Sequence, residues 1–358
     1  STVRAVPEAA RGPRGTAPAL TKAKHQLRDW VESRLIGFRW GEDETAFAHQ
    51  LNAELKGTGL LEKTEPGYIA EIRLQRQGGF LLLQTGMAID GCGFDDSVYL
   101  LRTTSEGWRR VWQNEQNNYT EKEYRPQSLH SVQISPWNKE NDYFVMTLGT
   151  FSWCSSAWHP VYFRVYRLGP DPEAVPLIEG SETSFLGARN PPILGSISRD
   201  SVLIEYSVRS IDAGVHSRAK VRKYALGKDH RPSRVAPVAL KPRDFVDEWL
   251  TSDWKESRAW SNAETRKALS DWHTKLHTDF VSGDFLYPTM HCQSRPDWWQ
   301  VGIEFSNQPE PLYFRVQWRP PYKFTLLRVS ETPDASCSEK DPEADEGART
   351  LFPLPAEQ

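Results

Sequence analysis

Hydrophobic and polar residues alternate along most of this chain with the two-residue period of β-strands. The clearest example is residues 142–168, DYFVMTLGTFSWCSSAWHPVYFRVYRL, where two long alternating runs flank a loop. Val161, Phe163 and Val165 fall on one face of the second run, and the residues between them fall on the other. The pattern predicts two antiparallel strands, with a shorter strand before them and another after them.

The same order of runs occurs four times, and its first strands begin at residues 68, 128, 192 and 287. A unit of this kind cannot bury both faces alone, so neighbouring units must stack. The predicted fold is therefore mainly β with helical additions. It has four antiparallel four-stranded units, β-propeller-like, with an N-terminal helix pair and a helical insertion before the last unit. A pair of β-sandwich domains has the same periodicity and stays an alternative.

Helical spacing replaces the alternation in two places. Leu27, Val31 and Leu35 repeat at helical spacing, as do Phe245 and Trp249 after Pro242. With these segments the predicted organisation is an extended N-terminal arm at 1–22, N-terminal helices at 23–60, β units one to three at 61–241, a helical insertion at 242–280, β unit four at 281–333 and an acidic C-terminal tail at 334–358.

Composition narrows the classes of function. The net charge of −3 and the pI of about 6.3 argue against nucleic-acid binding as the main role. No apolar run reaches the length that a bilayer span needs. The chain begins at Ser1 without Met, which indicates removal of an export signal or trimming.

The cysteines form an even set of four. In an exported protein they favour two disulfides, and positions in the repeats suggest Cys92–Cys154 and Cys292–Cys337. Buried thiols in a cytosolic chain are the alternative.

Candidate binding residues cluster in the connections between the second and third strands of the repeats. In a propeller these connections lie on one face, where loops on a rigid scaffold commonly carry function. The alternative is that the Asp and His side chains only support the turns. The predicted binding face comprises Asp90, Asp95, Asp96, Trp153, Trp158, His159, Asp212 and His216.

No cofactor motif is present, and no cofactor is predicted. Two weaker patterns are worth following: the carboxylates of Asp90, Asp95 and Asp96 suit calcium, and His273 and His277, four apart on a predicted helix, suit zinc. The spacing of the carboxylates matches no EF-hand, and the histidines lack the Glu of HExxH. No catalytic residue is assigned.

Three runs, LGTFSWCSSAWHPVYFRVYRLGP, SIDAGVHSRAKVRKY and PRDFVDEWL, resemble those of uncharacterised exported bacterial proteins with propeller-like repeats, over about residues 68–331. These proteins have no assigned activity, so the resemblance implies export and no chemistry.

We expect a secreted or periplasmic, non-catalytic binding or scaffold protein, within an extracellular or envelope assembly. Its extended termini suit a protein partner or self-assembly, and exposed Trp and Tyr would suit carbohydrate. The alternative function is a glycan-directed hydrolase that uses the carboxylates of the predicted binding face.

Overall fold

The computed structural model describes residues 13–57, 69–90, 93–115, 126–136, 143–151, 157–169, 174–185, 192–212, 214, 217–226, 232–235, 239–277, 282–319 and 323–341. The chain divides into two compact units. Unit one comprises Ser1–Thr183 and Ile197–Arg199, and unit two comprises Ser184–Ser196 and Asp200–Gln358.

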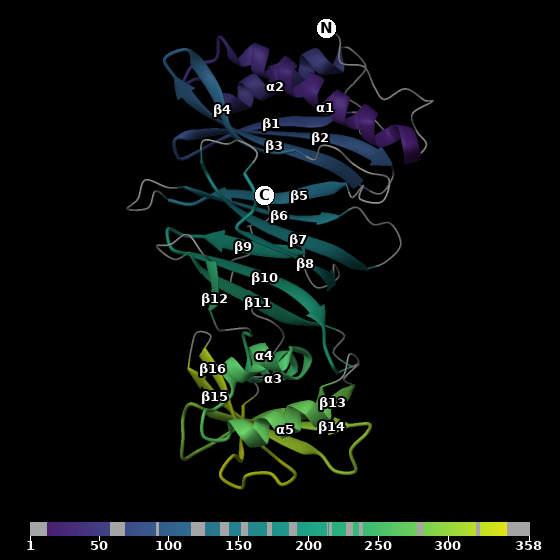
Figure 1. Cartoon of the computed structure of the whole chain (residues 1–358), viewed down its shortest axis with the longest axis vertical. Coiled ribbons are helices and arrows are strands. Elements are labelled where there is room, and N and C mark those ends of the chain that lie inside the picture. The colour runs from purple at the N-terminus through teal and green to yellow at the C-terminus, as the bar shows by residue number, and fades with distance from the viewer. Residues whose placement is uncertain are drawn as a thin grey trace. The chain divides into compact units, whose positions relative to one another are not determined.

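Unit one contains two helices and two antiparallel sheets of four strands (Figure 1). Sheet one has the order β1-β2-β3-β4 and sheet two has the order β5-β6-β7-β8. The elements are α1 (Pro13–Leu35), α2 (Glu44–Lys56), β1 (Ile69–Gln77), β2 (Phe80–Asp90), β3 (Gly93–Thr104), β4 (Gly107–Asn114), β5 (Gln127–Ile134), β6 (Phe144–Phe151), β7 (Trp158–Arg167) and β8 (Ile178–Phe185).

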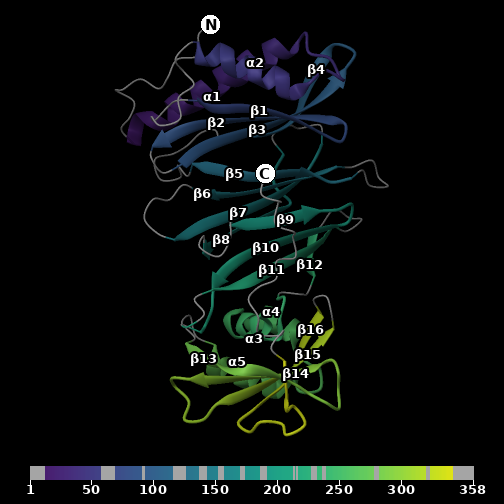
Figure 2. The same cartoon turned by 180° about the vertical axis from the view of Figure 1, so that it is seen from behind.

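The two helices cover one face of sheet one, as Figure 2 shows from behind. Asp43 caps α2, since its Oδ1 accepts hydrogen bonds from the N–H groups of Thr45 at 2.9 Å and Ala46 at 3.0 Å. Leu27 and Leu51, from the apolar stripes of the two helices, are buried against sheet one. The predicted helix pair is confirmed, although α1 begins at Pro13, inside the segment expected to be an extended arm.

The opposite face of sheet one packs on sheet two. Phe80, Leu100 and Trp112 of sheet one share a core with Val145 and Tyr162 of sheet two. This layer is almost entirely apolar, so burial of its side chains holds the two sheets together. The packing of sheet one on sheet two fits the prediction that neighbouring units stack, and a sandwich of two sheets has the same contact.

Unit two contains the other two sheets and the helical insertion. Sheet three has the order β12-β11-β10-β9, and sheet four has the order β16-β15-β14-β13-β17. The elements are β9 (Ile193–Ile197), β10 (Ser201–Arg209), β11 (Ser217–Leu226), β12 (Pro232–Val235), α3 (Pro242–Thr251), α4 (Trp254–Ser257), the 3-10 turn η3 (Arg258–Trp260), α5 (Arg266–Leu276), β13 (Gly283–His291), β14 (Trp298–Phe305), β15 (Leu312–Arg319), β16 (Lys323–Ser330) and β17 (Glu339–Lys340).

Helix α3 is buried along its length in unit two. Phe245 and Trp249 of α3 pack with Phe314 and Phe324 of sheet four, and the Phe245 and Phe324 rings stack at 5.1 Å. Trp249 Nε1 donates to Ser261 Oγ at 3.0 Å, which satisfies the polar atom of a buried ring. The apolar side of α3 therefore belongs to the core of sheet four.

The mainly β fold with four antiparallel sheets, an N-terminal helix pair and an insertion before the last sheet is confirmed. The start of the predicted acidic tail contains a short strand that the sequence did not predict. Glu339 and Lys340 form β17 beside β13, and a disulfide joins Cys292 to Cys337, as predicted. The repeat alone does not predict whether the four sheets close into a ring.

Candidate functional site

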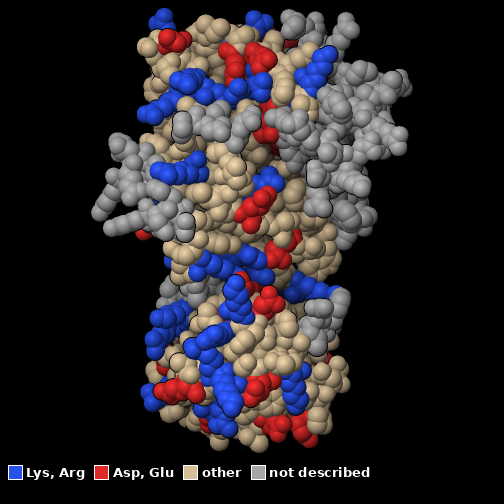
Figure 3. Space-filling model, in the orientation of Figure 1, with Lys and Arg blue, Asp and Glu red and all other residues tan. Residues whose placement is uncertain are grey.

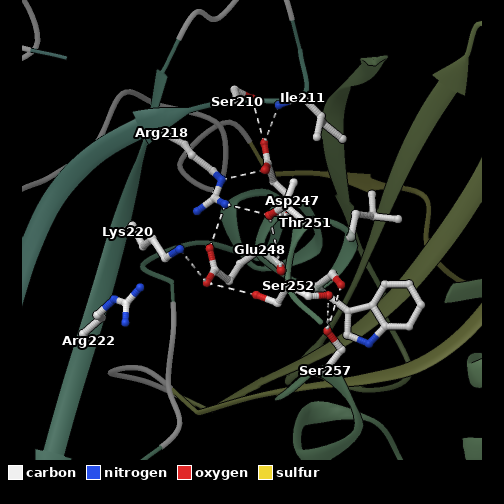
Figure 4. Close-up of polar contacts among 12 residues, drawn as sticks. Ser210, Ile211, Arg218, Lys220, Arg222, Asp247, Glu248, Thr251, Ser252 and Ser257 are labelled. Atoms are coloured by element: carbon white, nitrogen blue, oxygen red, sulfur yellow. Dashed lines mark hydrogen bonds and ion pairs between the residues drawn. The ribbon is translucent and has the colours of Figure 1, made fainter. Parts of the chain in front are cut away.

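The most highly charged buried cluster in the described part of the chain joins β11 to α3 in unit two. Arg218 of β11 reaches two consecutive carboxylates of α3 (Figure 4): its Nε lies 2.6 Å from Asp247 Oδ1 and its Nη2 lies 2.7 Å from Glu248 Oε2. The Arg218 side chain is 3% exposed, and both carboxylates are fully buried. One guanidinium thus uses two of its edges on two separate acids.

Further donors surround both carboxylates. Asp247 Oδ2 accepts from Ser210 Oγ at 2.8 Å and from the Ile211 N–H at 2.9 Å. Glu248 Oε1 lies 3.4 Å from Lys220 Nζ and 3.7 Å from Arg234 Nη2. These contacts give each acid partners besides Arg218.

The electrostatics of the cluster follow from burial and pairing. Burial alone would raise the pKa of Glu248, but Arg218 and Lys220 outweigh it and lower that pKa to about 2. Burial would likewise lower the pKa of Arg218, but Asp247 and Glu248 raise it above its ordinary value. Burial raises the pKa of nearby Asp244 to about 6, with Arg243 opposing it. Glu248 is therefore ionised at neutral pH and suits neither general-acid nor general-base chemistry.

The cluster was not singled out among the predicted site residues. Its sequence signal is the alternation of Arg218, Lys220 and Arg222, which places three cations on one face of β11. The side chains project to the same side of the strand in Figure 4. Since the partners Asp247 and Glu248 lie about thirty residues later, only the fold reveals the pairing.

The predicted binding-face residues Asp95 and Asp96 lie within β3, not in a loop, so their predicted placement is wrong. β3 already begins at Gly93, which pairs with Asp90 at the end of β2. Asp95 is buried and its Oδ2 lies 2.5 Å from Lys24 Nζ of α1. Asp96 Oδ2 accepts from the Leu129 N–H of β5 at 2.7 Å.

Adjacent residues of a strand point to opposite faces of the sheet. Asp95 accordingly faces α1, while Asp96 faces sheet two. Burial raises the pKa of Asp96 to about 7, and the nearby Asp95 adds to this, against the hydrogen bond from Leu129. Because the sheet separates the two carboxyl groups, they cannot flank one substrate as an acid–base pair.

Asp212 belongs to unit two, and its carboxylate accepts hydrogen bonds from the backbone of its own turn and of β13. Its Oδ1 accepts from the Gly214 N–H at 2.8 Å and its Oδ2 from the Phe285 N–H at 3.2 Å. This is the turn-supporting role weighed as the alternative to binding. Trp158 and His159 are half-buried and lie in β7, not in a loop.

The remaining predicted positions lie outside the described residues: these are Cys92, Trp153, Cys154 and His216, together with the Asp90 side chain. The Cys92–Cys154 disulfide and the meeting of all these loops on one face therefore stay predictions.

The histidine pair considered for zinc lies on or just after α5, with its rings stacked at 4.8 Å. His273 Nε2 is 2.9 Å from the Ser252 carbonyl oxygen, and His277 Nδ1 is 2.9 Å from the Leu250 carbonyl oxygen. These ring nitrogens must donate to the carbonyls, so they are not available as metal ligands in this conformation. Across the described ranges, no group of three His, Cys, Asp or Glu side chains could hold a metal ion.

The sequence did not predict an exposed apolar surface of unit one. Ile36 and Trp40, in the connection from α1 to α2, are 81% and 49% exposed. Trp40 is backed by Trp108, with ring centroids 5.8 Å apart, and by the Arg76 guanidinium, 5.1 Å from the Trp40 centroid. Trp108 Nε1 in turn donates a hydrogen bond to the Phe38 carbonyl oxygen at 2.7 Å. We call Ile36 and Trp40, with their supports Arg76 and Trp108, the Trp40 surface.

On the face shown in Figure 3, acidic and basic side chains are mixed over the surface, in keeping with the net charge of −3. None of the helices searched within the described residues has the length and apolarity of a membrane span.

Comparison with known proteins identifies no family. No family model matches the chain, and no curated protein matches it. Among solved structures, a complex of BT0996 and RGII is 9% identical, with 72% of each protein covered and a TM-score of 0.26. A thermostable family-43 glycoside hydrolase is 8% identical, covering 77% of this protein and 98% of that one, with a TM-score of 0.20.

A third structure, a putative exo-beta-1,3-galactanase from Bifidobacterium bifidum s17, is 10% identical. The match covers 74% of this protein and 93% of that one, with a TM-score of 0.18. At such low TM-scores these likenesses carry no functional argument.

Proposed function

We propose that this chain is an exported, non-catalytic binding or scaffold protein that engages a protein partner through the Trp40 surface. The observation that carries the proposal is the exposure of Ile36 and Trp40, with Trp40 supported by the Trp108 ring and the Arg76 guanidinium. Trp residues are common anchors of protein interfaces.

The hydrogen-bond and ion-pair partners of the predicted binding-face carboxylates favour a binding role over hydrolysis. Asp95 is paired with Lys24, Asp96 with a backbone N–H, and Asp212 with two backbone N–H groups. A glycosidase needs two carboxyl groups facing each other across one substrate. Since Asp95 and Asp96 lie on opposite faces of sheet one, they do not provide that arrangement.

Export is supported by the disulfide between Cys292 and Cys337, which closes a loop over a separation of 45 residues. Structural disulfides persist in oxidising compartments and are rare in reducing ones. A secreted or periplasmic location is therefore part of the proposal. Membership of an envelope assembly and the resemblance to exported bacterial proteins belong to it as well.

The proposal is tested by site-specific photo-crosslinking in the cells that produce the protein. A photoreactive amino acid at position 36 should yield a discrete crosslink to another protein or to a second copy. The additional substitution Trp40→Ser should reduce that crosslink at least fivefold, because it removes the anchor while leaving the fold. Position 175 is the matched control, since Val175 is 82% exposed and lies on the chain before β8, outside this surface.

A crosslink at position 36 that survives Trp40→Ser would contradict the proposed surface. Turnover of a glycan by the purified chain, lost on Asp212→Asn or Asp96→Asn, would contradict the non-catalytic role and support the glycan-directed hydrolase instead.

A further inference from the structure

The layer between sheets one and two contains a carboxyl group at a point of direct contact between the two sheets. Asp96 of β3 reaches out of sheet one and accepts the Leu129 N–H of β5 at 2.7 Å. Beside it, Ser128 Oγ lies 3.4 Å from the Phe94 N and 3.3 Å from the Phe94 carbonyl oxygen. β3 and β5 are thus joined by a short polar seam.

Most of the other described side chains of this layer are apolar, although it includes Tyr162 and Tyr166, and the Ile134 N–H of β5 donates to Gln77 Oε1 of β1 at 3.0 Å. Leu129 itself belongs to the buried cluster that includes Val98, Leu100 and Trp112. Asp96 is half-buried, so an ionised carboxylate there loses part of its water and regains a single strong hydrogen bond. The neutral carboxylic acid makes the same contact without the cost of a buried charge.

The pairing of β5 in its own sheet explains why Leu129 is available. The register of β5 against β6 shifts between Leu129 and Ser131. Such an irregularity locally disrupts the ladder and re-aims the backbone. The Leu129 N–H then bonds to sheet one, so the seam depends on a built-in feature of β5.

We propose that Asp96 is a protonation-dependent clasp between sheets one and two, which holds them most firmly when its carboxyl group is neutral and loosens them when it ionises. The clasp is a conformational device of unit one, and it does not depend on the identity of the partner at the Trp40 surface.

The groups around Asp96 support this assignment. Asp95, on the same strand, disfavours ionisation of Asp96, whereas Arg73 of β1 and Lys24 of α1 favour it. From β7, the buried Tyr162 also interacts electrostatically with Asp96, and burial raises the pKa of Tyr162 well above its ordinary value. Tyr162 thus stays neutral at physiological pH and adds no charge beside Asp96.

The sign of the effect follows from the two protonation equilibria. The folded pKa of Asp96 is about 7, above the ordinary value of 3.8 that applies once the seam opens. The closed seam therefore binds more protons than the open one between these values. Stability of the seam is fully present below about pH 4 and is lost as pH rises to about 7, after which the loss levels off.

Besides Asp96 of β3, the seam has a titrating group on β5, which is His130. Burial lowers the pKa of His130, whose Nε2 contacts Thr150 Oγ1 at 3.1 Å. A histidine with a lowered folded pKa stabilises the fold as pH rises, which is the opposite sign. A loosening of β5 with rising pH can therefore not be assigned to His130.

The test is hydrogen exchange of the intact chain followed by mass spectrometry, from pH 5 to pH 8.5, corrected for the intrinsic rate at each pH. Protection of β3 and β5 peptides should fall up to about tenfold per pH unit between pH 5 and 7 and then level off. In Asp96→Asn, which keeps an oxygen for the Leu129 N–H, the protection should change less than about twofold. Peptides of α5 in unit two are the internal reference, and Asp284→Asn on the exposed side of β13 is the matched control.

Flat protection of β5 in the wild-type chain, or an equal slope in Asp96→Asn, would overturn the clasp. Should Asp96→Asn fail to fold, carbon-13 NMR of the wild-type aspartate carboxyls supplies the second measurement. One carboxyl titrating near pH 7, together with shifts of the Leu129 amide, supports the clasp, and its absence overturns it.

Discussion

Removal of the Arg218 charge provides the sharpest test of how unit two is held together. The substitution Arg218→Met keeps most of the side-chain length but leaves Asp247 and Glu248 buried without their shared guanidinium. It deletes the contacts at 2.6 Å to Asp247 and 2.7 Å to Glu248, and the hydrogen bond at 3.2 Å to Thr251 Oγ1. Breaking a buried pair by removing one partner typically costs about 3–5 kcal/mol.

The surviving contacts place the expected cost at the lower end of that range. Asp247 keeps the Ser210 hydroxyl and the Ile211 N–H, while Glu248 keeps Lys220 at 3.4 Å. We therefore expect Arg218→Met to lower the free energy of unfolding by about 3 kcal/mol. The assay is guanidinium denaturation followed by tryptophan fluorescence, with hydrogen exchange of α3 as a local readout.

Two comparisons show whether the lost stability comes from the unpaired charges. The triple variant Arg218→Met, Asp247→Asn, Glu248→Gln removes both acids with their partner and should recover most of the loss. Arg319→Met is the surface control: Arg319 is 58% exposed and 3.7 Å from its acid, so it should cost less than about 1 kcal/mol.

The pH dependence supplies an independent check. The folded pKa of Glu248 is about 2, below its ordinary 4.5, so its contribution to stability is present above pH 4.5 and is lost as pH falls towards 2. The difference between wild type and Arg218→Met should shrink over that window. A cost below about 1 kcal/mol at pH 7, or a triple variant no more stable than the single one, would refute this account of the cluster.

Three further substitutions test the fold elsewhere. Replacing both Cys292 and Cys337 by Ser opens a loop spanning 45 residues and should lower the free energy of unfolding by about 2–4 kcal/mol. The measurement is a denaturant titration without reductant, and an unchanged midpoint would argue against a structural disulfide. Gly149→Ala should lower the free energy of unfolding by about 1–3 kcal/mol, because the added Cβ would collide with a carbonyl oxygen of β5 and with the Tyr162 ring. Gly169→Ala should be close to neutral in the same thermal-unfolding scan, because its Cβ would meet nothing within 4 Å. Asp212→Ala removes the acceptor of two backbone N–H groups and should cost about 1–3 kcal/mol by chemical denaturation; no change would mean that water replaces the carboxylate.

The alternating pattern predicted the sheets well because a half-buried strand carries its period in its own sequence. It failed at Asp95 and Asp96, since acidic residues are uncommon in strands and suggest a loop. Their place in β3 depends on Lys24 of α1 and the Leu129 N–H of β5, which are contacts between distant parts of the chain. A single sequence does not reveal such pairings.

The candidate site was harder to predict for a related reason. Arg218 lies on a strand whose alternation is visible, but its carboxylate partners lie on a helix in a later segment. Exposure of Trp40 is equally invisible in composition, because many of the described aromatic residues fill cores. The short β17 was missed because its acidic surroundings resemble a solvated tail, whereas the disulfide at Cys337 holds it in place.

Strand β17 also has a consequence for handling the protein. It pairs with Met290 and His291, so it occupies hydrogen-bonding positions at the open edge of β13. An unoccupied edge is a template for pairing with another molecule. A chain that ends at residue 335 would expose these positions and lose the disulfide that anchors β17. It should therefore aggregate at concentrations where the longer protein stays in solution.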